Sequence, residues 1–254
     1  MSSQASKSIL RDTTAVILAG GFGTRLASIV PDLPKPMAPV NGRPFLEYLL
    51  EYVRNNGISD VILCLHHLAS VVEKHFGDGR CFGLRIRYSR EITPCGTGGA
   101  IRLASALVKT NMVVVFNGDS FCPVDLEKLV SVNQDSSADL TMVATCVEDT
   151  SRYGSLEYDP DTLLITGFRE KSVIPVAGGW INAGIYTARR SFFANLPDSL
   201  PCSLEKEIFP DLCQRHALGV FLCGAPFLDI GTPDSYFSAG GYFAKAQGKE
   251  NASI

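Results

Sequence analysis

Cysteine or histidine spacing of the kind that binds zinc or builds a disulfide framework is missing from the sequence. The eight cysteines include no C-x-x-C pair, and the four histidines show no zinc-ligand spacing. Most of the cysteines stand in apolar runs, as Cys64 and Cys146 do, where this residue usually serves as a small buried apolar side chain. We therefore expect neither a disulfide framework nor a zinc site.

A strong excess of one charge and a long apolar run are also missing. The 254 residues carry 23 basic and 26 acidic side chains, a net charge of −3, so no overall field attracts nucleic acid or anionic lipid. No run approaches the ~18 apolar residues of a membrane span, and residues 1–12 lack the apolar core of a signal peptide. We predict a cytoplasmic protein without nucleic-acid or membrane partners, in which a local site must hold any anionic ligand.

What the sequence does contain is an alternation of short apolar runs with helix-period stretches. We expect strands at 14–19, 60–65, 84–88 and 112–116, and helices at 44–56, 68–76 and 98–109. Residues 112–116 are apolar throughout, as in a central strand covered on both faces. This rhythm predicts an α/β, Rossmann-like fold with a mixed, mostly parallel central sheet and helices on both faces.

The rhythm changes after residue 138, and no linker separates the two parts. We expect strands at 139–147, 180–187, 219–223 and 227–230, a hairpin of 154–158 and 163–168, and helices at 191–196, 203–216 and 233–245. The sequence therefore predicts one domain over residues 13–245, in which the second half extends the same sheet. Residues 1–12 and 246–254 are expected to be flexible tails.

A glycine-rich segment directly follows the first predicted strand. It runs from Leu18 to Leu26 as LAGGFGTRL, and its glycines let the backbone approach a phosphate with N–H groups directed at it. It is not the dinucleotide fingerprint, which would need glycine in place of Leu26, and it is not a P-loop. By itself the segment fits a phosphate-binding loop or a structural turn equally well.

Two basic residues accompany the glycine-rich segment. Arg25 lies within it, and Lys35 follows between Pro34 and Pro36, which stiffen the backbone and present the lysine from a rigid loop. A planar guanidinium and a compact ammonium both suit a polyphosphate. Alone, Lys35 would be interpreted as a solvated surface lysine. Next to the glycine-rich segment we interpret it as a phosphate ligand.

Two aspartates stand at the ends of apolar runs. Asp119 follows residues 112–116, and Asp229 lies within residues 227–230, so both carboxylates should emerge at the carboxyl ends of strands, where a hard cation can lie beside phosphates. Asp119 could also cap the next turn. Since 110 residues separate the two aspartates, spacing alone leaves their pairing open.

Three other motifs have weak signals of their own. Residues 96–99 could form only a flexible turn, and Glu170-Lys171 could be only a solvated charge pair. His66 and His67 are interpreted as structural or exposed, because no partner for acid–base chemistry accompanies them in the sequence.

Taken together, these motifs closely resemble the sugar-1-phosphate nucleotidyltransferase family. The resemblance rests on residues 18–25, 34–40, 44–47, 94–100, 117–119, 168–171, 182–186 and 227–233, in the family's order. Cys95 stands where relatives commonly have leucine, which is a small apolar change. Residues 28–39 and the lack of a C-terminal β-helix are most similar to D-glycero-α-D-manno-heptose 1-phosphate guanylyltransferases, followed by short mannose-1-phosphate guanylyltransferases.

The resemblance implies a nucleotidyltransferase fold and a role for each motif. Residues 13–138 would bind the nucleotide and residues 139–245 the sugar phosphate. Catalysis is assigned to Arg25 and Lys35, and Mg²⁺ binding to Asp119 and Asp229. Nucleotide binding is assigned to Leu18, Ala19, Gly20, Gly21, Gly23, Thr24, Glu91, Gly96, Thr97 and Gly118. Sugar-phosphate binding is assigned to Gly154, Glu170, Lys171 and Asn182.

The implied reaction is attack of a sugar 1-phosphate oxygen on the α-phosphorus of a nucleoside triphosphate, with pyrophosphate leaving in line. Because the attacking phosphate is already mostly ionised, no general base is required. The resemblance favours GTP and heptose 1-phosphate, which would give GDP-heptose for a capsule or another surface polysaccharide. Mannose 1-phosphate as substrate, a non-catalytic nucleotide-sugar sensor, and assembly into a homo-oligomer are left open.

Overall fold

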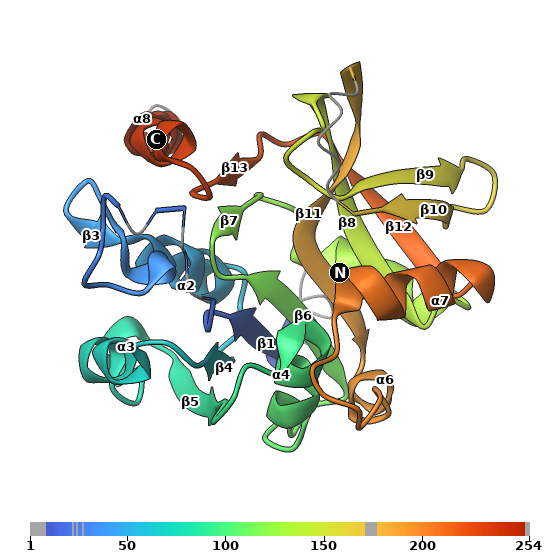
Figure 1. Cartoon of the computed structure of the whole chain (residues 1–254), viewed down its shortest axis with the longest axis horizontal. Helices are drawn as coiled ribbons and strands as arrows, with labels where there is room; N and C mark the ends of the chain where they lie inside the picture. The colour runs from blue at the N-terminus through green and yellow to red at the C-terminus, as the bar shows by residue number, and fades with distance from the viewer. Residues whose placement is uncertain (1–8, 22, 24, 27, 171–176, 252–254) are drawn as a thin grey trace, which may run out of the picture.

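A nine-stranded sheet forms the centre of the computed structural model, which describes residues 9–21, 23, 25–26, 28–170 and 177–251. The strands lie side by side in the order β5-β4-β1-β6-β11-β8-β12-β10-β9 (Figure 1). Their bounds, in chain order, are β1 Thr13–Leu18, β4 Asp60–Leu65, β5 Arg85–Arg90, β6 Met112–Asn117, β8 Leu140–Asp149, β9 Ser155–Asp159, β10 Leu164–Arg169, β11 Ala177–Arg189 and β12 Leu218–Cys223.

The directions of the strands confirm the predicted mixed, mostly parallel sheet. Strand β1 pairs in parallel with β4 and β6, β4 with β5, and β8 with β12. Strand β11 is antiparallel to β6 and β8, and β10 is antiparallel to β12 and β9. Strands β10 and β11 thus run against the rest. Because β11 lies between β6 and β8, the second half of the chain extends the sheet of the first half, as predicted.

Helices cover both faces of the sheet, because successive strand residues point to opposite sides. Ile17 belongs to the core beneath α2, α3 and α5, whereas its neighbour Val16 belongs to the core beneath α4, α6 and α7. The helices are α2 Phe45–Asn55, α3 Ala69–Phe76, α4 Gly96–Ser105, α5 Leu126–Asp135, α6 Arg190–Ala194, α7 Phe209–Gln214 and α8 Pro233–Asn251, with short helical turns η1 Lys35–Met37, η2 Arg80–Phe82 and η3 Leu204–Ile208.

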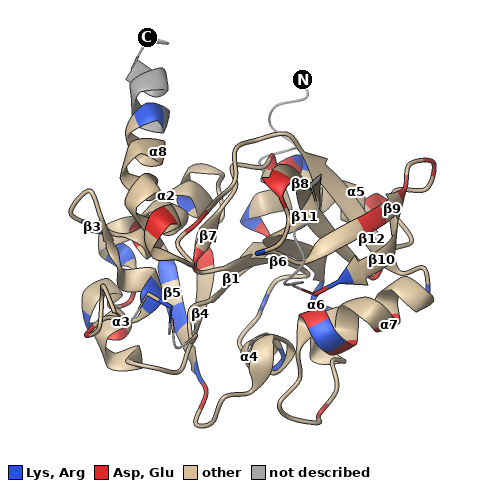
Figure 2. Cartoon of the chain, turned by 45° about the horizontal axis from the view of Figure 1, so that its top comes forward, with Lys and Arg blue, Asp and Glu red and all other residues tan. Residues whose placement is uncertain are grey.

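The last segment of the chain, β13 and helix α8, packs against elements of the first half, next to two small two-stranded sheets. Strand β13 (Leu228–Asp229) pairs antiparallel with β7 (Ser120–Phe121), and β2 (Pro39–Val40) pairs with β3 (Arg43–Pro44). Phe243 of α8 stacks on Tyr48 of α2 at a centroid distance of 4.0 Å, so α8 lies beside α2 (Figure 1, Figure 2). Among the helices of the described residues, none is long and apolar enough to cross a membrane.

The structure corrects several predicted elements. Residues 203–216 are not one α-helix: η3 is a π-helical turn in which Ile208 N donates to Ser203 O at 3.3 Å. Helix α7 begins after it, at Phe209, and its second residue is a proline that has no N–H to donate. The predicted strand 227–230 shortens to β13, which leaves the main sheet to pair with β7. Helix α8 continues beyond the predicted end at residue 245, to Asn251. The predicted hairpin of 154–158 and 163–168 is present as β9 and β10.

Candidate active site

Two adjoining cavities open at the carboxyl ends of β1 and β6. Cavity A has a volume of about 320 Å³, and cavity B of about 300 Å³. Cavity A is bordered by residues of the second half, such as Gly154 and Asn182, and cavity B by residues of the first half, such as Glu91 and Thr97. Both cavities share Gly21, Lys35, Asn117, Asp119 and Glu205. The site therefore has two compartments that meet along this shared border.

The glycine-rich segment lines both compartments. Gly118 N donates to Leu18 O at 2.9 Å, and a Cβ on Gly118 would lie only 2.7 Å from that oxygen, so the turn after β6 packs directly on the end of β1. Gly21, by contrast, has open space around its Cβ position and borders both cavities. Ala19 and Gly20 line cavity B. Thr24 lies outside the described residues.

The two predicted catalytic cations lie in different surroundings. Gly23 adopts a φ of +59°, and its Cβ position lies 2.8 Å from Lys35 Cβ, so the absence of a side chain there allows Lys35 to approach the glycine-rich segment. Lys35 is mostly buried, with 14% of its side chain exposed, and borders both cavities. Arg25 is exposed and lines cavity A. Of the two, Lys35 stands at the junction.

The two predicted metal ligands are brought together by strand pairing. Asp229 ends β13 and stands opposite Ser120 of β7, the residue after Asp119, and Ile230 N donates to Asp119 O at 3.0 Å. Each carboxylate holds a cationic side chain: Lys35 Nζ lies 2.5 Å from Asp119 Oδ2, and Arg152 Nη2 lies 2.8 Å from Asp229 Oδ1. The fold therefore places the backbones of Asp119 and Asp229 side by side, a proximity that sequence spacing left open.

Asp229 is also held by neutral donors. Tyr153 OH donates to its Oδ2 at 2.5 Å, and Gly231 N donates to its Oδ1 at 2.7 Å. Burial, together with the hydrogen bond to the Asp229 carboxylate, raises the pKa of the Tyr153 phenol far above its usual range. Tyr153 therefore stays protonated and remains a donor at any physiological pH.

The donor set of Asp119 and Asp229 fits a hard divalent cation. Both offer carboxylate oxygens, and each already attracts a positive side chain that marks where a cation is stabilised. No group of three or more His, Cys, Asp or Glu side chains that could enclose a metal occurs in the part of the chain that is described. Two carboxylates suffice for Mg²⁺, which keeps several waters and takes its other ligands from substrate phosphates.

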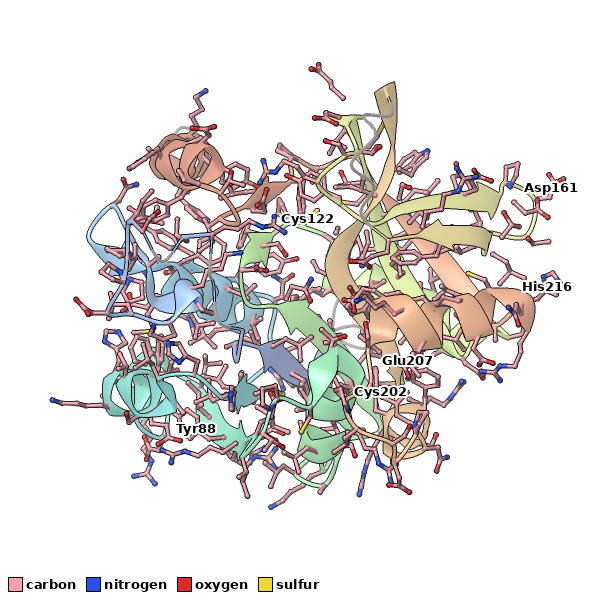
Figure 3. The ribbon with its side chains drawn as sticks, in the orientation of Figure 1. Tyr88, Cys122, Asp161, Cys202, Glu207 and His216 are labelled. Atoms are coloured by element: carbon pink, nitrogen blue, oxygen red, sulfur yellow. The ribbon has the colours of Figure 1, made fainter. Side chains whose placement is uncertain are left out.

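Cavity B is shaped by the approach of η3 to the start of α4. A Cβ on Gly96 would lie 2.3 Å from Cys202 O, and Gly98 N donates to that same oxygen at 2.9 Å; Figure 3 labels Cys202 where α4 approaches the segment leading into η3 and α7. The Thr97 hydroxyl donates to Glu205 Oε2 at 2.7 Å and accepts from Leu204 N at 2.9 Å. These contacts fix the backbone of Gly96 and Thr97 against the second half of the chain.

The opposite border of cavity B is formed by Glu91. Its Oε2 accepts a hydrogen bond from Cys95 N at 2.8 Å, and its backbone O lies 3.0 Å from His66 Nδ1. His66 itself is half-buried and lines the cavity, which the sequence did not specify. The loop before α4 is therefore anchored by the predicted nucleotide-binding glutamate.

Three of the four residues predicted to bind the sugar phosphate border cavity A. Gly154, Glu170 and Asn182 all border it, while Lys171 lies outside the described residues. The Asn182 amide is engaged within the protein, because its Nδ2 donates to Tyr186 OH at 2.7 Å and its Oδ1 accepts from Gly184 N at 2.8 Å. Asn182 thus also stabilises the bend of β11 at this cavity.

Sequence reasoning missed two charged residues of the site, Arg152 and Glu205. Arg152 precedes the Tyr153-Gly154 pair, of which only the glycine was selected, and it borders cavity A. Glu205 was placed inside the predicted helix of residues 203–216, whereas the π-helical turn directs it to the shared border of both cavities. The spacing of neither residue could have revealed these positions, because each depends on contacts with a distant strand or helix.

Comparison with known proteins identifies the family of this chain. A model described as "Nucleotidyl transferase" matches residues 14–245, nearly the whole described chain. The protein belongs to the nucleotidyl transferase family. The resemblance inferred from the sequence motifs, the Rossmann-like fold and the assignment as an enzyme are thereby confirmed. Members of this family typically use a divalent metal ion.

Individual relatives cover almost the entire chain. It is 38% identical over 223 residues to a D-glycero-α-D-manno-heptose 1-phosphate guanylyltransferase of Campylobacter jejuni, covering 88% of this chain and 96% of that protein. It is 35% identical to a mannose-1-phosphate guanylyltransferase of Mycobacterium tuberculosis, covering 87% of this chain and 62% of that protein. The family relationship therefore extends over both compartments of the site.

Solved structures show the same fold. The crystal structure of HddC from Yersinia pseudotuberculosis matches with a TM-score of 0.80 at 33% identity, covering 91% of this chain and 99% of that one. The same Yersinia protein complexed with GMP-PN matches with a TM-score of 0.78.

Proposed function

We propose that the protein is a guanylyltransferase that joins GTP to D-glycero-α-D-manno-heptose 1-phosphate, releasing GDP-heptose and pyrophosphate. The observation that carries the proposal is the Lys35–Asp119 pair, which lies on the border of both cavities. A group that bridges two compartments is where two substrates would meet. Support for GTP and heptose comes from the relatives named for that reaction and from the relative bound to a guanine nucleotide analogue.

The nucleotide would occupy cavity B. Glu91 orders the loop before α4, and the rigid backbone of Gly96 and Thr97 offers amide and carbonyl groups suited to the edge of a base. The triphosphate would then extend over Gly21 toward Lys35. The N–H groups of the glycine-rich segment and the Lys35 ammonium supply positive charge along this path.

The sugar 1-phosphate would occupy cavity A, between Gly154, Glu170 and Asn182. Its phosphate oxygen attacks the α-phosphorus of GTP, the new P–O bond forms as the bond to the β-phosphate oxygen breaks, and pyrophosphate leaves. The nucleophile is already ionised, so the protein's task is to position two anions and to offset their repulsion. Asp119 and Asp229 would hold Mg²⁺, which when bound neutralises phosphate charge.

The experiment that tests this proposal is a matrix of substrates. GTP, ATP, UTP and dTTP are each incubated with heptose, mannose and glucose 1-phosphates and Mg²⁺, and pyrophosphate release is measured. The largest kcat/KM is expected for GTP with heptose 1-phosphate, and EDTA should abolish it until Mg²⁺ is restored. Turnover that is greatest with another pair of substrates would replace the proposed specificity, and no turnover with any pair would leave a nucleotide-sugar sensor.

Mannose 1-phosphate is the second candidate substrate, favoured by the similarity to mannose-1-phosphate guanylyltransferases over 87% of the chain. The two sugars differ by one CH(OH) group. A pocket that contacts only the carbon of such a group discriminates by about 10- to 200-fold, whereas one that hydrogen-bonds its hydroxyl rejects the smaller sugar about 10⁴- to 10⁵-fold. In the described part of cavity A, the Asn182 amide already has partners within the protein, which favours the smaller factor. We therefore expect measurable but lower kcat/KM with mannose 1-phosphate. A cytoplasmic reaction that supplies GDP-heptose for a surface polysaccharide is the setting we propose.

A further inference from the structure

Arg152 binds the carboxylate of Asp229 through only one of its three guanidinium nitrogens, as far as the described residues show. Among the described residues, its hydrogen bonds all come from Nη2: 2.8 Å and 3.0 Å to the two Asp229 carboxylate oxygens and 3.3 Å to Ser235 Oγ. Its Nε is buried and has no hydrogen-bond partner in the described residues. The guanidinium carbon lies 5.3 Å from the centre of the Tyr153 ring. A buried, unpaired donor is costly, which indicates that this arrangement is not the only one the side chain serves.

Arg152 and a divalent cation compete for the same atoms. Nη2 contacts both oxygens of Asp229, and these are the oxygens that a metal ion would need. A positive guanidinium and a divalent cation on one carboxylate would also repel each other strongly in a site where only 13% of the Asp229 side chain is exposed. When the metal binds, Arg152 must therefore release at least part of its contact with Asp229.

The surroundings give the released guanidinium one obvious partner. Arg152 borders cavity A and not cavity B, so it lies on the side proposed for the sugar 1-phosphate. About a third of its side chain is exposed, which leaves room to turn into the cavity. A planar guanidinium with free donors is suited to bind a phosphate through two parallel hydrogen bonds.

We propose that Arg152 is a counter-ion that is exchanged during the reaction cycle: it pairs with Asp229 in the empty enzyme, and it binds the phosphate of the sugar 1-phosphate once a divalent cation has taken its place. This role rests on the proposed function and adds a substrate-binding residue to it. Arg152 keeps Asp229 neutralised while no metal is present and then delivers its charge to the incoming nucleophile. The metal and the sugar phosphate are thereby coupled through one side chain.

If Arg152 had only a structural role, its removal would change metal binding in the opposite direction. If Arg152 only holds Asp229 in position, its removal disorders the carboxylate and weakens the metal. If Arg152 competes with the metal, its removal strengthens metal binding in the absence of substrates. The sign of the change in metal affinity therefore separates the two roles.

The test compares Arg152→Gln with the wild type and with Arg215→Gln, an arginine that pairs with Asp139 and Asp211 and borders neither cavity. Mn²⁺ affinity is measured without substrates by electron paramagnetic resonance, and KM is measured for both substrates. We expect Arg152→Gln to bind Mn²⁺ about two- to fivefold more tightly and to raise the KM for sugar 1-phosphate about 10- to 100-fold. Its KM for GTP should stay within about twofold of the wild type, since single contacts outside cavity B change it little. Arg215→Gln should match the wild type in all three.

Weaker or unchanged Mn²⁺ binding by Arg152→Gln, or an equal rise of both KM values, would overturn the proposal. Should Arg152→Gln fail to fold, Arg152→Lys retains the charge but not the planar fork: its Mn²⁺ affinity should resemble that of the wild type while the KM for sugar 1-phosphate still rises. The proposed function fails separately, if the wild type itself releases no pyrophosphate from any substrate pair, and the Mn²⁺ titration remains readable in that case.

Discussion

Lys35 and Asp119 form an ion pair of 2.5 Å although 84 residues separate them in the sequence. Lys35 begins η1 and Asp119 lies between β6 and β7, so the contact joins the loop that follows the glycine-rich segment to the end of a central strand. Only 14% of the lysine side chain is exposed, against 41% of the aspartate. The ammonium is thus fixed by the protein, while the carboxylate faces the cavities and is available to a ligand.

Replacing Asp119 by asparagine tests the role of that carboxylate. Asp119→Asn keeps the size of the side chain but removes the charge that would hold a divalent cation, so we expect pyrophosphate release to fall about 10²- to 10³-fold. The free energy of unfolding should change by no more than about 1 kcal/mol, because the ion pair is partly exposed. Steady-state kinetics and urea denaturation measure the two effects.

The matched control for this substitution is Asp161→Asn. Asp161 is exposed at the tip of the β9–β10 hairpin, where Figure 3 labels it, and borders neither cavity. This variant should turn over like the wild type. A rate of Asp119→Asn within a factor of two of the control would show that the carboxylate takes no part in the reaction.

Gly231 offers a way to disturb Asp229 without changing it. A Cβ at Gly231 would lie 2.5 Å from Asp229 Oδ1 and 3.5 Å from Lys35 Nζ, so Gly231→Ala should push the carboxylate aside. Because this carboxylate is one of only two in the proposed metal site, we expect a loss of about tenfold or more in metal affinity, the range typical of disturbed metal surroundings. Titration with Mn²⁺ in the absence of substrates measures the loss.

Gly224→Ala is the control for that experiment, since nothing lies within 4 Å of its Cβ position and no positive φ is involved. It should bind Mn²⁺ as the wild type does and unfold at nearly the same urea concentration. If Gly231→Ala binds metal as tightly as Gly224→Ala does, then Asp229 is not a ligand of the metal.

The sheet was more predictable than the site, for physical reasons. Residues 112–116 are apolar on both sides, so the pattern alone identified a buried central strand, and β6 covers Met112–Asn117. The helix expected over 203–216 failed because Pro210 and the Ser203 carbonyl favour a π-helical turn, which periodicity does not distinguish from an α-helix. A hydrophobic pattern predicts that a segment is helical. It does not predict whether the backbone hydrogen bonds span four residues, as in an α-helix, or five, as in a π-helical turn.

The site depends on contacts that no local pattern contains. Asp119 and Asp229 were each identified from their position after an apolar run, whereas their proximity comes from the pairing of β7 with β13. Arg152 has no sequence signature, because its importance comes from reaching Asp229, 77 residues away. The family resemblance predicted residues that belong to contiguous motifs. Residues such as Arg152, whose partners lie far away in the sequence, could be found only from the fold.

Gly96 should be needed both for its backbone and for its lack of a side chain. Its φ is +75°, and a Cβ would lie 2.3 Å from Cys202 O. Gly57, which follows α2, also has a positive φ of +94° but has open space around it. Gly57→Ala should therefore cost about 1–2 kcal/mol of unfolding free energy for the backbone alone, and Gly96→Ala about 1–3 kcal/mol more for the clash.

Urea denaturation of the two glycine variants measures this difference, and the KM for GTP provides a second readout. Gly57→Ala should leave the KM unchanged, while Gly96→Ala should raise it, because moving the Cys202 segment also displaces the border of cavity B. Equal stabilities for the two variants would mean that the approach of Cys202 to α4 is looser than the structure shows.

The cysteines should behave as eight independent thiols of two kinds. Cys81 and Cys146 are exposed, and the other six are buried. Burial raises the pKa of the thiols of Cys64, Cys95, Cys122, Cys202 and Cys213. A higher pKa leaves less thiolate at a given pH, and burial blocks the reagent, so both effects slow alkylation. In native protein at pH 8, iodoacetamide should therefore label two thiols, identified by mass spectrometry as Cys81 and Cys146.

The same experiment on unfolded protein examines the pair Cys122 and Cys223, whose sulfur atoms lie 3.8 Å apart in the core. Since both are free thiols in the structure, unfolding in urea without a reductant should expose all eight cysteines to the reagent. Labelling of six would instead reveal a disulfide between these two. The double variant Cys81→Ser, Cys146→Ser serves as the control: it should lose the whole fast phase in the native protein and keep six slow thiols, because neither replaced side chain belongs to the core.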